Sequence, residues 1–320
     1  MHRSYLYVPG DRPDRVDKAM ASGSDAVIID LEDAVAPARK GEARSEVSRL
    51  LGRLDRRSDT DPEVLVRVNN DAGLADDLRA VLGSGGTAIY LPKADVPSLE
   101  SLEAFLGGET AEVVALIETA RGLLDARAVA AHRLVRNLAI GEADLIADLA
   151  MTPSPDRREL GPMRSALVVA SAAAGIESPT GPVSTDFRNL ELLRADTEGL
   201  LRMGFGARSA IHPAQVPVIN EVFTPGEDEV ARATRLVELH DDHRAAGAGA
   251  FVDDEGRMVD EAVVRAARRS LSRRRAGSGE VRPAERCFPG GATGIHAPTG
   301  PDSSDGPRTA DPRHQGETDG

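Results

Sequence analysis

Two acidic residues, Glu118 and Asp144, each follow a short apolar run in the sequence. Residues 113–117 precede Glu118, and residues 138–140 precede the segment Gly141-Glu142-Ala143-Asp144. Such runs are typical of buried parallel strands, whose carboxyl ends carry the functional groups of α/β enzymes. Two carboxylates at the ends of neighbouring strands therefore predict a site for a divalent metal.

Magnesium is the metal that this pair favours, because only oxygen ligands are available and no His or Cys residues cluster at the spacing of a zinc site. Considered alone, Glu118 could be a carboxylate that stabilises a helix N-terminus, and Asp144 could cap a helix starting at Leu145. Considered together at successive strand ends, they favour Mg²⁺ binding.

Arg67 lies near the end of another apolar segment, residues 64–68. A guanidinium in such a position is costly to bury unless it is paired. Its planar fork of donors suits a substrate carboxylate, and the alternative is a structural ion pair. We favour the substrate-binding role.

Three further carboxylates, Asp30, Glu32 and Asp33, follow the apolar residues 26–29. They repel one another, so a cation or a basic side chain must lie close to them. They could surround metal-bound water, or one of them, Asp33, could cap the next helix. The basic residues that could pair with them are Arg3, Arg67 and Lys93.

Lys93 and His212 each follow a strand candidate, and each has two possible roles. Lys93 could form a Schiff base with a substrate, but an ion pair within the acidic site is favoured. His212 could act as an acid or base, or make only a structural hydrogen bond.

Eight apolar strand candidates recur along the chain and alternate with helical segments. The strand candidates are residues 5–8, 26–29, 64–68, 88–91, 113–117, 138–140, 175–176 and 209–211. The helical segments are residues 14–22, 37–55, 75–82, 96–105, 122–131, 163–174 and 186–203. This alternation predicts an α/β protein with a (β/α)8 TIM barrel.

The pattern divides the chain into three parts. Residues 1–225 form the predicted barrel, which is the catalytic domain. Residues 226–275 form a helical extension, with helices over 227–246 and 261–275 on either side of a turn flanked by short extended pieces. Residues 276–320 are rich in Gly, Pro, Ser, Thr and charged residues, so we expect a disordered tail.

Composition limits the classes of partner. The chain has 320 residues, 41% of them hydrophobic, which is enough for one barrel of roughly 250 residues. A net charge of −13 and an aromatic content of 3% argue against a nucleic-acid or anionic-membrane partner. The single cysteine, Cys287, suits a cytoplasmic location, and we expect neither a signal peptide nor a membrane span.

In order along the chain, these segments resemble the citrate lyase beta subunit-like branch of the HpcH/HpaI aldolase superfamily, the CoA-ester lyases. The resemblance covers about residues 3–272. It is carried by Arg3-Ser4-Tyr5-Leu6-Tyr7-Val8-Pro9-Gly10, Asp25-Ala26-Val27-Ile28-Ile29-Asp30-Leu31-Glu32-Asp33-Ala34-Val35, Val66-Arg67-Val68-Asn69, Leu91-Pro92-Lys93, Ile117-Glu118-Thr119-Ala120-Arg121-Gly122, Gly141-Glu142-Ala143-Asp144 and Ala210-Ile211-His212-Pro213-Ala214-Gln215.

The resemblance implies a Mg²⁺-dependent barrel, trimeric or hexameric, that cleaves or forms a C–C bond beside a CoA thioester. Glu118 and Asp144 match the metal ligands, and Arg67, with Glu118, matches the residues that bind the substrate. Asp260, in Met258-Val259-Asp260, matches a catalytic aspartate carried on a lid that reaches a neighbouring subunit. Residues assigned loosely to CoA phosphates are Arg3, Lys40 and Arg44.

The implied reaction joins or separates a small 2-oxo or 2-hydroxy acid and an acyl-CoA, as in malyl-, citramalyl- or citryl-CoA. Asp260 is the candidate acid or base, and Arg67 the group that orients the acid. Three alternatives stay open at this point: an aldolase acting on free 2-oxo acids, a malyl-CoA thioesterase, and a metabolite-binding barrel without catalysis.

Overall fold

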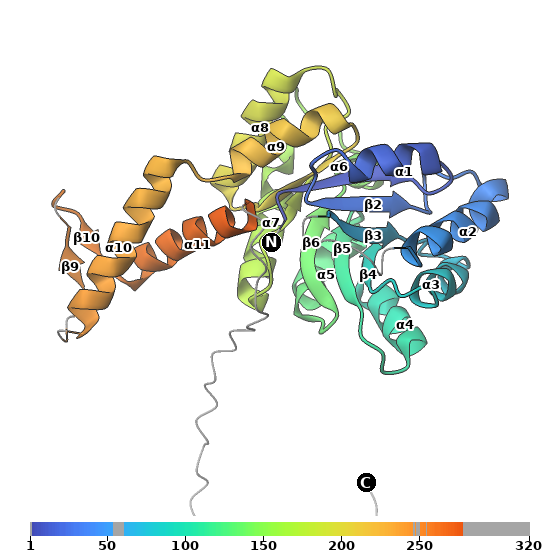
Figure 1. Ribbon diagram of the computed structural model, residues 1–320, viewed down its shortest axis with the longest axis horizontal. Coiled ribbons are helices and arrows are strands. Elements are labelled where there is room, and N and C mark those ends of the chain that lie inside the picture. Colours follow the sequence, from blue (N-terminus) through green and yellow to red (C-terminus); the bar gives the residue numbers. More distant parts are fainter. Residues whose placement is uncertain (1, 54–60, 246, 248–249, 254, 278–320) are drawn as a thin grey trace, which may run out of the picture. The chain divides into compact units, whose positions relative to one another are not determined.

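A computed structural model describes residues 2–53, 61–245, 247, 250–253 and 255–277. Eight parallel strands close into a barrel in chain order, and β8 pairs with β1 (Figure 1). The strands are β1 (Ser4–Pro9), β2 (Ala26–Asp30), β3 (Glu63–Arg67), β4 (Ala88–Leu91), β5 (Glu112–Ile117), β6 (Val135–Ile140), β7 (Thr180–Gly181) and β8 (Ala207–Ala210). The predicted (β/α)8 TIM barrel is therefore confirmed.

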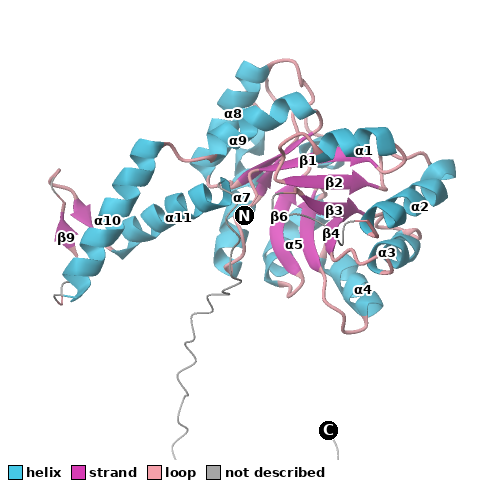
Figure 2. Ribbon diagram, viewed as in Figure 1, coloured by secondary structure: helices cyan, strands magenta, loops and turns pink. Residues whose placement is uncertain are grey.

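Helices follow the strands and surround the barrel (Figure 2). They are α1 (Pro13–Met20), α2 (Lys40–Leu51), α3 (Leu74–Leu82), α4 (Val96–Leu106), α5 (Ala120–Ala131), α6 (Glu142–Asp148), α7 (Gly161–Ala174), α8 (Leu190–Met203) and α9 (Val216–Phe223). Short 3-10 turns are η1 (Pro37–Arg39), η3 (Arg158–Leu160) and η4 (Pro213–Gln215). Side-chain caps fix the first residues of two of these helices. Asp95 and Ser98 form a capping box at α4, and the Thr119 hydroxyl caps α5.

Strand residues alternate between two buried layers, as the period of a strand requires. Side chains on the outer face pack beneath the helices, and they include Leu6, Val8, Val27 and Ile29. Side chains on the inner face fill the barrel, and they include Tyr5, Ile28, Leu65, Tyr90 and Leu116.

One strand was predicted wrongly. The sequence placed the seventh strand at residues 175–176, but Gly175 ends α7 in a left-handed conformation with φ 68°, and β7 is Thr180–Gly181. A two-residue strand that contains glycine has no apolar run to detect. A Cβ at Gly181 would approach Leu200 Cδ1 of α8 to 2.6 Å, so a larger residue there would require the Leu200 side chain to move.

The C-terminal extension contains α10 (Glu227–Ala245), β9 (Phe251–Val252), β10 (Met258–Val259) and α11 (Glu261–Gly277). The two short strands lie where extended pieces were predicted beside a turn, and they pair antiparallel. Helices α10 and α11 pack against each other. His240 Nε2 lies 3.3 Å from Glu261 Oε2 across the two helices. The lid role and the boundary at 225 remain predictions, and residues 278–320 of the expected tail lie outside the described residues.

No helix in the described part of the chain is long and apolar enough to cross a lipid bilayer.

Candidate active site

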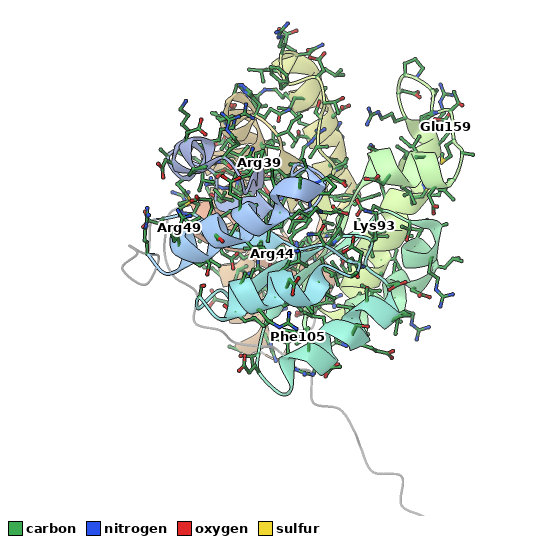
Figure 3. All side chains as sticks on the ribbon, turned by 90° about the vertical axis from the view of Figure 1, so that its right-hand side faces the viewer. Arg39, Arg44, Arg49, Lys93, Phe105 and Glu159 are labelled. Atoms are coloured by element: carbon green, nitrogen blue, oxygen red, sulfur yellow. The ribbon has the colours of Figure 1, made fainter. Side chains whose placement is uncertain are left out.

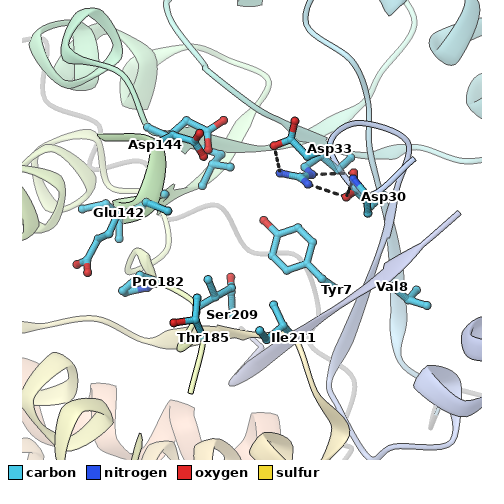
Figure 4. Close-up of a pocket in the computed structure, with 18 of the residues that line it drawn as sticks. Tyr7, Val8, Asp30, Asp33, Glu142, Asp144, Pro182, Thr185, Ser209 and Ile211 are labelled. Carbon is cyan, nitrogen blue, oxygen red and sulfur yellow. Dashed lines mark hydrogen bonds and ion pairs between the residues drawn. The ribbon is translucent and has the colours of Figure 1, made fainter. Parts of the chain in front are cut away.

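A cavity of about 510 Å³ opens at the carboxyl end of the barrel. It is lined by residues that end or follow β1, β2, β3, β5, β6, β7 and β8 (Figure 4). Its volume is within the range of small-molecule sites, and this end of a TIM barrel is where active sites lie. Glu118, Asp144 and Arg67 all line it.

Glu118 follows β5 and is only 2% exposed. Its Oε1 accepts a hydrogen bond of 2.8 Å from the Lys93 backbone N–H, which fixes the carboxylate at the floor of the cavity. Gly141 makes room for it, because a Cβ there would come within 2.5 Å of Glu118 Oε2. Glycine is therefore required at the end of β6 for Glu118 to take this position.

Asp144 lies in the first turn of α6 and is exposed to the cavity. The helix starts at Glu142, so the alternative in which Asp144 caps a helix from Leu145 is wrong. Burial, together with the negative charges of Glu32 and Asp144, raises the pKa of Glu118 to about 8. The site is thus short of positive charge.

This charge deficit is the feature that a divalent cation would correct. Glu118 and Asp144 supply carboxylate oxygens, the donor type that Mg²⁺ prefers, and two carboxylates leave positions for water and substrate oxygens. The described residues contain no cluster of three or more His, Cys, Asp or Glu side chains that could hold a metal alone. The pair therefore fits Mg²⁺ completed by small oxygen ligands.

Arg67 ends β3 and lies in register with Asp30 at the end of β2. Two hydrogen bonds join them, Nε to Oδ1 at 2.8 Å and Nη2 to Oδ2 at 2.6 Å. Burial lowers the pKa of Arg67, but the hydrogen bonds and charge of Asp30 outweigh this and raise it. Asp30 thus holds a charged guanidinium at the wall of the cavity.

The remaining Arg67 nitrogen, Nη1, lies 3.0 Å from Glu32 Oε2 and 3.8 Å from Asp33 Oδ2. Arg67 therefore forms a structural ion pair and also lines the cavity, and its substrate-binding role stays a prediction. Glu32 in turn forms an ion pair with Lys93 Nζ, so the structure favours the ion-pair interpretation of Lys93.

A sequence profile of the HpcH/HpaI aldolase/citrate lyase family matches residues 3–213. The chain belongs to this family. A citrate lyase subunit beta-like protein of Mycobacterium tuberculosis is 36% identical over 279 residues, which cover 84% of this chain and 94% of the relative. A (3S)-malyl-CoA thioesterase of Cereibacter sphaeroides is 34% identical over 281 residues, which cover 85% and 94%.

The fold also agrees with a solved structure. CitE of Mycobacterium tuberculosis, in complex with magnesium, acetoacetate and coenzyme A, matches with a TM-score of 0.70 and 32% identity. The match covers 85% of this chain and 97% of CitE. The likeness extends well beyond the strands that carry the acidic pair.

Three basic residues that were predicted to contact CoA do not line the cavity. Arg3 precedes β1, so it lies at the opposite, amino end of the barrel, where it pairs with Asp25 at 2.7 Å. Lys40 Nζ donates to Asn69 Oδ1, and Arg44 Nε donates to the buried Asp77 at 2.6 Å. Figure 3 labels Arg44 on α2 and Lys93 after β4 in the turned view.

Asp260 lies between β10 and α11, in the C-terminal extension. Its Oδ1 accepts hydrogen bonds from the backbone N–H groups of Ala262 at 2.9 Å and Val263 at 3.0 Å. The residue thus caps α11, and its catalytic role stays a prediction. His212 also makes a structural contact, because its Nδ1 accepts a 3.1 Å hydrogen bond from Ala214 N–H.

Sequence reasoning missed Tyr7, Ser209 and Arg157, which line the cavity. Tyr7 is two residues after Tyr5 on β1, and that spacing alone would have placed both side chains on one face of the strand. Arg157 lies in the loop before η3, with φ 50°, and its Nη1 is 3.2 Å from Glu142 Oε2. A loop position carries no periodic signal, so the sequence pattern could not reveal it.

Proposed function

We propose that the protein is a Mg²⁺-dependent CoA-ester lyase that cleaves or forms a C–C bond in a 3-hydroxyacyl-CoA. The observation that carries this proposal is the pair Glu118 and Asp144, short of positive charge, in one cavity with Arg67. The magnesium, acetoacetate and coenzyme A bound to the related CitE support it.

Each residue has a part that its position suits. Glu118 and Asp144 hold Mg²⁺, which when bound would supply a positive charge that polarises an oxygen of the substrate. Arg67, kept charged and fixed by Asp30, orients the carboxylate of the small acid. Asp260 accepts or donates the proton that the C–C bond change requires, once the extension carries it to a site.

The test is a turnover screen with purified protein and Mg²⁺. Malyl-, methylmalyl-, citramalyl- and citryl-CoA are offered for cleavage, and acetyl-CoA or propionyl-CoA is offered with glyoxylate, pyruvate or oxaloacetate for condensation. The proposal expects at least one pair to react, with activity lost in EDTA and restored by Mg²⁺. Turnover of none of them, or turnover that EDTA leaves unchanged, would overturn it.

Thioester hydrolysis is a second candidate, supported by the 34% identity to a (3S)-malyl-CoA thioesterase. Water would attack the thioester carbonyl of malyl-CoA, and the C–S bond would break to give malate and CoA. Product analysis separates the candidates, because the lyase gives glyoxylate and acetyl-CoA instead. An aldolase acting on free 2-oxo acids would need no CoA, so cleavage of free 4-hydroxy-2-oxo acids would identify it.

We also propose that the chain assembles as a homotrimer or hexamer in the cytoplasm. The location of Asp260 on an extension, which the family resemblance links to a neighbouring subunit's site, motivates the oligomer. Light scattering at several concentrations measures it, and a monomer at assay concentration would contradict it.

A further inference from the structure

All three tyrosines of the chain have their side chains inside the barrel. Tyr5 and Tyr90 are fully buried, and neither lines the cavity. Tyr7 is the one that reaches it, and Figure 4 shows its ring among the labelled side chains of the pocket, with the hydroxyl directed inward. Packing accounts for the ring of Tyr7, but the hydroxyl at the cavity needs a separate explanation.

Two neighbours fix the ring of Tyr7. Tyr90 meets it edge to face, with ring centroids 5.7 Å apart and an interplanar angle of 74°. The guanidinium of Arg67 lies over it, 5.1 Å from its centroid, and Asp30 holds that guanidinium in turn. The hydroxyl is therefore carried at a defined position, which is what selective hydrogen bonding needs.

The hydroxyl can donate a hydrogen bond into a cavity with many acceptors. The cavity wall holds the carboxyl groups of Asp30, Asp33, Glu118 and Asp144, together with the hydroxyls of Ser209 and Thr185. Arg67 already donates to Asp30. The Tyr7 phenol is uncharged and lies beside Arg67, so it is suited to donate to an oxygen of a ligand bound there.

Its position indicates which oxygen. In Figure 4 the Tyr7 ring lies between Asp30 on one side and Asp144 on the other. A small acid whose carboxylate lies at Arg67, and whose oxygen on carbon 2 faces the Glu118–Asp144 pair, has that oxygen between the two.

We propose that the Tyr7 hydroxyl donates a hydrogen bond to the oxygen on carbon 2 of the small acid, and so selects 2-oxo and 2-hydroxy acids. This inference rests on the proposed function and names a selectivity residue within the same site. A phenylalanine would fill the same space and keep both ring contacts, so the ring alone does not require the hydroxyl. A site built to hydrogen-bond a substrate oxygen discriminates strongly against ligands that lack it.

The test compares Tyr7→Phe with Tyr5→Phe, which removes a fully buried hydroxyl that does not line the cavity. Binding of pyruvate and of propionate, which lacks the oxygen on carbon 2, is measured by calorimetry in saturating Mg²⁺. Tyr7→Phe should weaken pyruvate binding about 10-fold to 100-fold and leave propionate binding unchanged, so that the preference for pyruvate falls. Tyr5→Phe should keep the wild-type preference, and Mg²⁺ affinity should stay the same in both variants.

Three results would overturn the proposal: an unchanged preference in Tyr7→Phe, an equal loss in Tyr5→Phe, or a wild-type protein that prefers propionate or binds neither acid. Because this experiment measures binding and not turnover, its outcome is independent of the turnover screen that tests the proposed function. A wild-type protein that binds pyruvate through Tyr7 but converts no CoA thioester would overturn the lyase and keep the selectivity residue. In condensation assays, Tyr7→Phe should raise KM for the acid more than it lowers kcat.

Discussion

The two ends of the barrel place a glutamate in opposite electrostatic surroundings. At the amino end, Glu63 opens β3 and receives two hydrogen bonds of 2.8 Å from Arg136 of β6, and His2 lies 2.6 Å from its Oε2. At the carboxyl end, Glu118 follows β5 and faces the carboxylates Glu32 and Asp144. The carboxylate at the amino end is paired with an arginine across the barrel, whereas the carboxylate at the carboxyl end has negative neighbours.

The pKa values express this difference. Burial alone would raise both, but hydrogen bonds from His2 and Arg136 lower the pKa of Glu63 to about 2. Burial and negative neighbours raise the pKa of Glu118 to about 8. A paired carboxylate stabilises the fold, whereas an unpaired buried one is a cost that a bound cation removes. The comparison assigns stability to the amino end and chemistry to the carboxyl end.

The largest expected effect is that of Glu118→Gln. Loss of a metal ligand should reduce Mg²⁺-dependent turnover about 10³-fold or more, since Lewis-acid assistance contributes several kcal/mol. The free energy of unfolding without Mg²⁺ should not fall, because Gln resembles the protonated Glu118 that burial favours. Steady-state kinetics and urea unfolding measure the two quantities, and a variant that is inactive only because it is unfolded would not support the comparison.

The second prediction asks whether proton transfer depends on Asp260 of the C-terminal extension or on the residues of the cavity. If Asp260 moves the proton, Asp260→Asn should bind Mg²⁺ normally and lose about 10²-fold to 10⁴-fold in kcat. Asn is chosen because it can still cap α11, whereas Asp260→Ala removes the cap as well. Wild-type rates in Asp260→Asn would remove this residue from the mechanism and return proton transfer to the pocket.

The third prediction concerns the amino end. Glu63→Gln breaks a largely buried ion pair, so unfolding at pH 7 should cost about 3 kcal/mol less, while kcat/KM of the folded enzyme stays the same. Because the pKa of Glu63 is lowered from 4.5 to about 2, the difference between wild type and variant is full above about pH 5 and vanishes as the pH falls through 2. Urea unfolding at several pH values measures this. A loss of activity without a loss of stability would contradict the comparison.

The smallest effect is the pH dependence of Mg²⁺ binding. With a pKa of about 8, Glu118 is protonated at pH 6 and must release its proton to bind a cation. The apparent affinity should therefore rise by up to about tenfold per pH unit from pH 6 to 8 and level off above. Titrations of wild type and Glu63→Gln should follow the same curve, and an affinity that is flat over this interval would be inconsistent with an unpaired Glu118.

Much of the fold could be predicted because parallel strands are apolar on both faces. Residues 88–91 were predicted as a strand and are observed as β4 (Ala88–Leu91), since both faces are buried. The same rule failed at β7, which has only Thr180 and Gly181. Closure of the barrel, and not an apolar run, places those two residues between β6 and β8.

The site was predictable where a charge directly follows a strand, as Glu118 and Arg67 show. Arg3 could have been excluded by the same logic, because it precedes its strand and so lies at the amino end. Tyr7 was missed because the sequence does not show whether a strand tyrosine lies in the middle of the barrel, as a core residue, or near its carboxyl end, beside the cavity. The ion pair between Arg67 and Asp30 depends on the register of β2 and β3, which composition does not determine.

Calorimetric titration of Mg²⁺ at pH 8 into wild type, Glu118→Gln and Glu63→Gln measures which end of the barrel binds the metal. Wild type should show one site per chain, Glu118→Gln should lose that site, and Glu63→Gln should keep it unchanged. Equal Mg²⁺ binding in wild type and Glu118→Gln, or none in wild type, would contradict the assignment of the metal to the carboxyl end of the barrel.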